Sequence, residues 1–123
     1  TEIDITAQTG IKSLDVTIDC DNLDARELGT MGIPARFDLC NIEGFEDTNG
    51  TMHPAEDVRE AISALGFPIE DAVKDKPSIR LKIDKMFTRL LTGFPGNNNF
   101  ILTVTENNGL STTKTLKYYV PAN

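Results

Sequence analysis

The stretch FILTVTENNG at residues 100–109 decides the fold class of this 123-residue chain. Phe100, Leu102 and Val104 alternate with Ile and Thr residues, and an apolar residue at every second position is typical of a half-buried β-strand. Asn108-Gly109 is the preferred pair for a two-residue type I′ turn, in which both central residues need positive φ. The residues after this turn alternate again as far as Val120. The C-terminal end of the chain is therefore predicted to be an antiparallel hairpin.

The same alternation recurs nearer the N-terminus. It predicts strands over residues 2–7, 11–19, 35–39 and 78–83. In the first of these strands, Glu2 and Asp4 place charges on the outward side, and charges on an edge strand hinder the growth of one sheet onto another. We therefore expect a monomer.

Helices and turns are predicted between these strands. Residues 54–65 combine a proline at the first helical position, acidic residues in the first turn and apolar residues at helical spacing. A second helix, at 85–92, has an apolar face and Asp84 as its cap. The polar, glycine-containing segment 41–52 is predicted to be a loop, and residues 97–99 a turn.

The order of these elements determines the expected architecture. Strands at both ends, without a regular alternation of strand and helix, do not describe a parallel α/β sheet. Two antiparallel sheets packed face to face would bury the alternating Ile, Leu, Val and Phe residues. We expect residues 1–123 to form one mainly β domain, an antiparallel β-sandwich with short helical insertions at 54–65 and 85–92.

The charge balance limits the partners. The chain has 12 Lys and Arg against 19 Asp and Glu, a formal net charge of −7. Nucleic acids and anionic membrane surfaces both require clustered cations, so neither is expected as a partner. No apolar stretch approaches the roughly 20 residues that span a bilayer, and no transmembrane segment is expected.

Few residues are candidates for chemistry. His53 is the only histidine, and no Gly-x-Ser-x-Gly pattern accompanies it, so we predict no catalytic residue, no cofactor and no enzyme activity. Cys20 and Cys40 lack the paired spacing of a zinc or thioredoxin-like site. They are either two half-buried thiols or one disulfide, and the sequence leaves both alternatives open.

Two sets of residues are candidates for binding. Asp19, Asp21 and Asp24 lie within six positions at the end of a predicted strand, and carboxylates spaced in this way can hold Ca²⁺. The competing interpretation is structural, with Asp24 as a helix cap and Asp21 in a turn. Phe45 and Tyr119 are aromatic rings that the predicted core does not use, and such rings can bind a sugar or another extracellular ligand.

Four ordered patches, at residues 3–7, 10–16, 65–68 and 100–109, carry a family resemblance. They are similar to the immunoglobulin-like, PKD-like domains on the N-terminal side of exported, lipoprotein-type surface proteins of gut Bacteroidetes, domains of unknown function. The resemblance implies an immunoglobulin-like β-sandwich at the cell outer surface or in the periplasm, anchored to lipid through a segment absent from this chain. It brings no functional residues, and Glu106 stands where the family commonly has Asp.

We therefore expect a non-catalytic module of a cell-surface or secreted protein. Its role would be that of a spacer, a docking element or a protein-interaction domain beside the neighbouring domains of a longer protein. The alternative is a module that binds carbohydrate or another extracellular ligand through Phe45 or Tyr119.

Overall fold

The computed structural model describes residues 2–82 and 93–121. The elements follow the chain as β1 (Glu2–Thr6), β2 (Ile11–Cys20), α1 (Ala25–Thr30), β3 (Arg36–Asp38), β4 (Phe45–Glu46), β5 (Met52–His53), α2 (Ala55–Ala64), the 3-10 helix η1 (Glu70–Ala72), β6 (Ser78–Lys82), β7 (Gly96–Glu106) and β8 (Ser111–Val120). These strands pair antiparallel, which confirms the prediction of a mainly β fold. The helix predicted at 85–92 lies outside the described residues.

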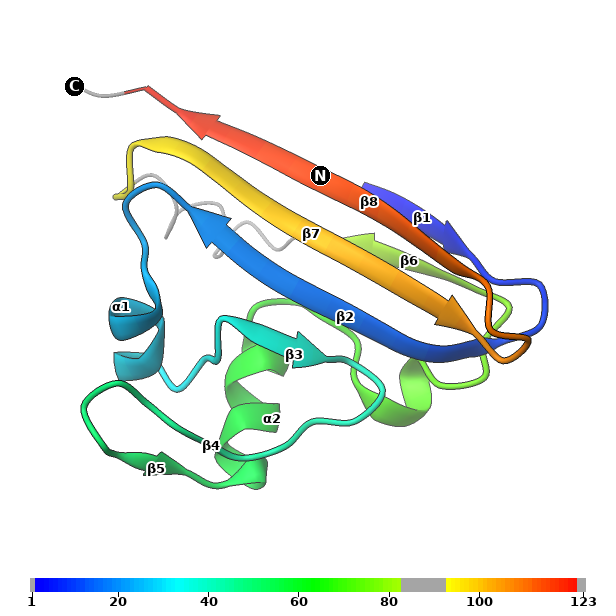
Figure 1. The fold of residues 1–123 in the computed structure, drawn as a ribbon, viewed down its shortest axis with the longest axis horizontal. Helices are drawn as coiled ribbons and strands as arrows, with labels where there is room; N and C mark the ends of the chain where they lie inside the picture. Colours follow the sequence, from blue (N-terminus) through cyan, green and yellow to red (C-terminus); the bar gives the residue numbers. More distant parts are fainter. Residues whose placement is uncertain (1, 83–92, 122–123) are drawn as a thin grey trace.

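The largest sheet has four strands in the order β3-β2-β7-β8 (Figure 1). Across its two central strands, Val16 lies opposite Leu102 and Ile18 lies opposite Phe100. These residues are buried, whereas the positions between them are half-buried or exposed. One face of the sheet therefore carries the hydrophobic core, as the alternation predicts.

A second sheet pairs β1 with β6. Ile5 of β1 and Leu81 of β6 are buried in the same hydrophobic cluster as the inner face of the four-stranded sheet. In Figure 1 this pair lies behind β7 and β8. Lys114 of β8 donates a hydrogen bond from Nζ to the backbone carbonyl oxygen of Asp4, at 3.0 Å. The two sheets thus share one core.

The helix α2 covers part of this core. Val58 and Ile62, four residues apart on one helical face, are fully buried. Pro54 precedes the helix with an extended ψ of 154° and is its N-cap. The predicted placement of Pro54 at the first helical position is therefore displaced by one residue, because the carbonyl of Pro54 already accepts the first helical bond, from the Val58 amide at 3.1 Å.

The structure corrects the predicted turn of the C-terminal hairpin. Outside glycine, positive φ occurs in the described residues only at Glu70 and Asp75, so Asn108 does not have the backbone of a type I′ turn. The Glu106 amide instead bonds to the Leu110 carbonyl at 2.8 Å, across a three-residue loop that ends at Gly109 with φ +90°. A three-residue loop with glycine in the last position is the next most common hairpin connection.

The side chain of Asn107 explains this choice of turn. Its Nδ2 donates to the backbone oxygen of Thr9 at 2.9 Å and to Oδ1 of Asp75 at 3.1 Å. The carboxylate of Glu106 accepts from the Thr9 amide at 3.2 Å. The hairpin is therefore fastened to the turn between β1 and β2 and to the segment before β6.

Two segments that the sequence predicts to be a turn and a loop contain strands in the structure. The predicted turn at residues 97–99 is part of β7, where these asparagines pair with the end of β8 and with the end of β2. The predicted loop 41–52 contains β4 and, with His53, β5, which form a small hairpin of their own. In both places pairing with a neighbouring strand outweighs local composition.

Candidate functional site

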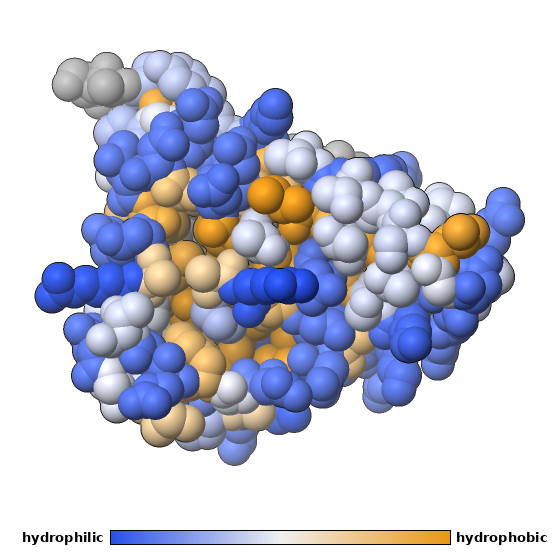
Figure 2. Space-filling model, viewed as in Figure 1, coloured by the Kyte–Doolittle hydropathy of each residue, from blue (hydrophilic) through white to orange (hydrophobic). Residues whose placement is uncertain are grey.

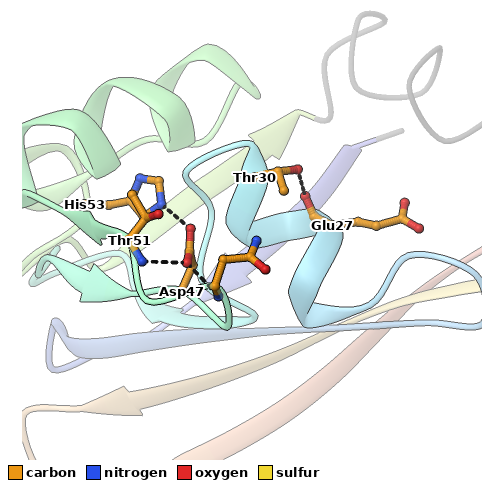
Figure 3. Close-up of polar contacts among 6 residues, drawn as sticks. Glu27, Thr30, Asp47, Thr51 and His53 are labelled. Carbon is orange, nitrogen blue, oxygen red and sulfur yellow. Dashed lines mark hydrogen bonds and ion pairs between the residues drawn. The ribbon is translucent and has the colours of Figure 1, made fainter.

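The β4–β5 hairpin brings His53 and Asp47 together (Figure 3) and also carries the aromatic residue Phe45. Phe45 lies opposite His53 in the strand register, and their rings stack with centroids 4.9 Å apart and an interplanar angle of 17°. His53 Nε2 lies 2.9 Å from Oδ2 of Asp47. Because an ionised carboxylate only accepts hydrogen bonds, Nε2 carries the proton and donates it.

The carboxylate of Asp47 accepts several of the hydrogen bonds that hold this hairpin. Its Oδ1 accepts hydrogen bonds from the backbone amides of Asn49 and Thr51, both at 2.9 Å. Only 4% of its side chain is exposed, against 19% for His53. The hydrogen bond from His53, followed by that from the Thr51 amide, lowers the pKa of the Asp47 carboxyl. The carboxylate therefore fixes both the turn and the orientation of the imidazole.

The helix α1 supports the hairpin at close range. A Cβ placed on Gly29 would lie 2.7 Å from Cβ of Asp47, so only glycine fits at this position. Gly29 is buried in the last turn of α1, whose first turn is capped by Asp24. The short helix thus serves as a platform for the hairpin that carries Phe45.

Phe45 also lines an open pocket of about 380 Å³ at the β3 edge of the four-stranded sheet. We call this hollow the Phe45 pocket. Its lining residues are Asp15, Pro34, Arg36, Phe37, Asp38, Asn41, Glu43, Gly44 and Phe45. Asp15 and Asp38 lie directly opposite each other on β2 and β3, and Arg36 is two residues from Asp38 on the same strand face.

The two aspartates of the pocket differ in their roles. Oδ1 of Asp38 accepts the backbone amides of Leu14 at 3.0 Å and of Cys40 at 2.9 Å. It is therefore bound within the fold, whereas the half-buried Asp15 sits beside it without such bonds among the described residues. Asp15, Arg36 and Glu43 are the charged groups most open to a ligand, because Asp38 is already engaged.

The two predicted ligand-binding rings lie in different places. Phe45 is half-buried in the small hairpin beyond β3. Tyr119 is 67% exposed on β8, at the opposite edge of the four-stranded sheet. The structure therefore brings Phe45 together with polar groups but does not place Tyr119 in the same site.

The three predicted calcium ligands each have a separate position. Oδ1 of Asp24 accepts the Glu27 amide at 3.0 Å as the cap of α1, and Oδ2 of Asp21 accepts the Asn97 amide at 2.9 Å. Asp19 is exposed on the outer face of β2. Within residues 2–82 and 93–121, no group of three or more His, Cys, Asp or Glu side chains is arranged to hold a metal ion. The structural interpretation accounts for Asp21 and Asp24.

Both cysteines are free thiols in this structure. Cys20 ends β2 and is half-buried, and Cys40 is buried just after β3. Burial raises the pKa of each thiol to about 11. A thiol with a raised pKa is a poor nucleophile at neutral pH, because the thiolate is the reactive form.

Sequence reasoning missed the pair formed by Asp47 and His53. One signal was available, since the Asn49-Gly50 pair lies between Phe45 and His53 and is a common hairpin turn sequence. Strands of two residues are too short to show a period, and the contact with Gly29 depends on tertiary packing. The local pattern of this segment therefore predicts only a loop.

Comparison with known proteins identifies no relative. No family model, no curated protein and no solved structure matches this chain. Among the described helices, none has the length and apolar character to cross a membrane.

Proposed function

We propose that the chain is a non-catalytic interaction module of an exported cell-surface or secreted protein, and that a neighbouring protein segment docks in the Phe45 pocket. The observation that carries this proposal is the pocket itself, an open hollow of about 380 Å³ beside a hairpin held by Asp47. A wall that is ordered before binding reduces the entropy lost on docking.

We also propose that the module is an immunoglobulin-like β-sandwich. The support for this architecture is that β1–β6 and the four-stranded sheet contribute to one hydrophobic cluster. A two-layer arrangement of this kind gives a rigid frame, and binding residues are commonly carried on loops and short hairpins at the margin of such a frame.

The charges of the pocket favour a particular kind of segment. Its lining contains three carboxylates, from Asp15, Asp38 and Glu43, and one guanidinium, from Arg36. The whole chain has a net charge of −7. Like charges repel across an interface, so a basic or neutral polar segment fits this pocket better than an acidic one.

Hydrogen exchange tests the proposal. The backbone amides of Glu43 and Phe45 should exchange more slowly in the full-length gene product than in the isolated module, because the docked segment covers them. Replacing Asp15 by alanine in the full-length protein should reverse this protection, whereas Asp19→Ala, the same change at an exposed position of β2, should leave it unchanged.

Two results would contradict the proposal. One is equal exchange of the pocket amides in the module and in the full-length protein. The other is a gene that encodes neither an export signal nor a further domain.

A carbohydrate is the second candidate ligand for the Phe45 pocket. The observation that favours it is the combination of an aromatic ring with the hydrogen-bonding groups of Asp15, Asn41 and Glu43 around one hollow. Retention on a panel of immobilised glycans tests this candidate. Phe45→Leu should abolish retention, and Tyr119→Leu, at the other edge of the sheet, should not. Loss of retention in Tyr119→Leu alone would place the sugar on β8 and contradict the pocket as its site.

A further inference from the structure

β8 is a long strand at the edge of the four-stranded sheet. All ten of its residues, Ser111–Val120, pair with β7 without a shift in register. Figure 1 shows it as the outermost strand on its side of the sheet. Its other edge has no strand partner in the part of the chain that the structure describes. A long, straight edge of this kind is a template for another strand.

The register shows which backbone groups face outward. In an antiparallel pair, alternate residues bond to the partner strand, and the residues between them direct N–H and C=O away from it. The bond from the Glu106 amide to the Leu110 carbonyl sets this phase. The even-numbered residues of β8 therefore bond to β7, and the odd-numbered residues face outward. The outward-facing residues are Ser111, Thr113, Thr115, Lys117 and Tyr119, all of them exposed.

The side chains of β8 have a charge opposite to that of the rest of the molecule. The strand carries two cations, Lys114 and Lys117, and no acid, in a chain whose net charge is −7. Lys117 has no ion-pair partner among the described residues, and Lys114 is bound only to a backbone carbonyl. In Figure 2, weakly polar residues cover much of the surface around β7 and β8.

We propose that this edge binds an extended acidic polypeptide segment, which adds to the sheet as a fifth strand beside β8. Backbone bonds to Thr113, Thr115 and Lys117 would hold the segment, and an acidic residue opposite Lys117 would set its register. Its alternate, inward-facing residues would be apolar, because they lie beside Leu116 and Tyr118, which pack against the core.

A second copy of this chain is a poorer occupant of the edge. Two β8 strands paired about a two-fold axis would bring four lysines into one seam with no carboxylate among them. Lysines on edge strands are a common device against such pairing. The surface is also separate from the Phe45 pocket, which lies at the β3 edge and favours a basic segment.

Hydrogen exchange with a synthetic probe tests this inference. The probe is the capped peptide acetyl-TVEVTVEVT-amide, whose glutamates and threonines share one face and whose valines share the other. The outward amides of Thr113, Thr115 and Lys117 should exchange about tenfold or more slowly with the peptide bound. The amides of Lys114 and Leu116, already bonded to β7, should change little.

Charge reversal provides the matched variants. Lys117→Glu should weaken binding of the glutamate peptide about fivefold and strengthen binding of acetyl-TVKVTVKVT-amide by a similar factor. Lys12→Glu, the same change at an exposed site on β2, should alter neither affinity. Thr115→Pro removes an outward N–H without removing a bond to β7 and should abolish binding of both peptides. If Thr115→Pro fails to fold, the Lys117 series still decides the question.

Several results would overturn the inference. These are equal affinity for the two peptides, no added protection at the odd-numbered amides of β8, or added protection confined to the amides of the Phe45 pocket. Protection of these amides in the protein alone, together with a dimer by light scattering, would assign the edge to a second copy instead. Docking at the Phe45 pocket is tested separately, by the exchange of the Glu43 and Phe45 amides in the full-length protein.

Discussion

At the scale of single residues, two positions fix loops: Asp47 through contacts within its own hairpin, and Gly10 through a close approach to residues that are distant in the sequence. Asp47 bonds two amides of its own turn and the ring of His53. Gly10, with φ +95°, lies where a Cβ would come within 2.7 Å of Nδ2 of Asn107 and 3.1 Å of the carbonyl oxygen of Asp75. Gly10 thus allows the close contact with Asn107 and Asp75, and the carboxylate of Asp47 holds the β4–β5 turn.

The Asp47 carboxylate gives the β4–β5 hairpin a defined pH dependence. A carboxyl group with a pKa lower in the folded state than in the unfolded state contributes stability above its unfolded pKa, near 4, and loses that contribution as the pH falls through its folded pKa. Asp47→Asn should therefore lower the thermal midpoint at pH 5, and the difference from the natural protein should shrink by pH 3. Thermal unfolding of the two proteins at both pH values measures this. A difference that is constant between pH 5 and pH 3 would contradict the assignment.

A comparison of substitutions at Gly10 and Gly109 separates the cost of backbone strain from the cost of steric contacts. Both have positive φ, but nothing lies within 4 Å of a Cβ built on Gly109. Gly109→Ala should lower the free energy of unfolding by about 1 kcal/mol, the cost of an alanine in the left-handed region. Gly10→Ala should cost about 2 kcal/mol or more, because the new methyl group also displaces Asn107 and the Asp75 backbone. Urea unfolding measures both, and equal losses would show that the contacts of Gly10 do not matter.

At the scale of elements, the sequence predicted what depends on local pattern. β2, β7, β8 and α2 were found because each repeats its period often enough to identify the buried face. The β4–β5 hairpin was missed because two-residue strands show no period. The turn type at Asn108-Gly109 was wrong because Asn107 bonds to Thr9 and Asp75, which are distant in the sequence.

The candidate site was predictable only in part, for the same reason. Phe45 was singled out as a ring outside the core, but its stacking on His53 and its place beside Asp15 follow from the pairing of β4 with β5 and of β2 with β3. The acidic residues at 19, 21 and 24 are close in sequence, yet strand exit, turn and helix cap direct them to different partners. Proximity along the chain did not produce a shared site.

At the scale of the whole molecule, two sheets contribute to one hydrophobic core. The two edges of the four-stranded sheet carry different surfaces, the Phe45 pocket beside β3 and the open edge of β8. The two edges differ in charge, since most charged residues of the pocket are acids and lysines are the only charged residues of β8. Both edges can bind a partner only if the β1–β6 pair covers the inner face of the sheet and leaves the two edges accessible.

Methyl–methyl nuclear Overhauser effects test that arrangement most directly. We predict cross-peaks from the methyl groups of Ile5 and Leu81, in the β1–β6 sheet, to those of core residues on β2 and β7 such as Val16 and Leu102. A spectrum in which β1 and β6 show contacts with each other but none with the four-stranded sheet would contradict the two-layer core and the functions argued from it.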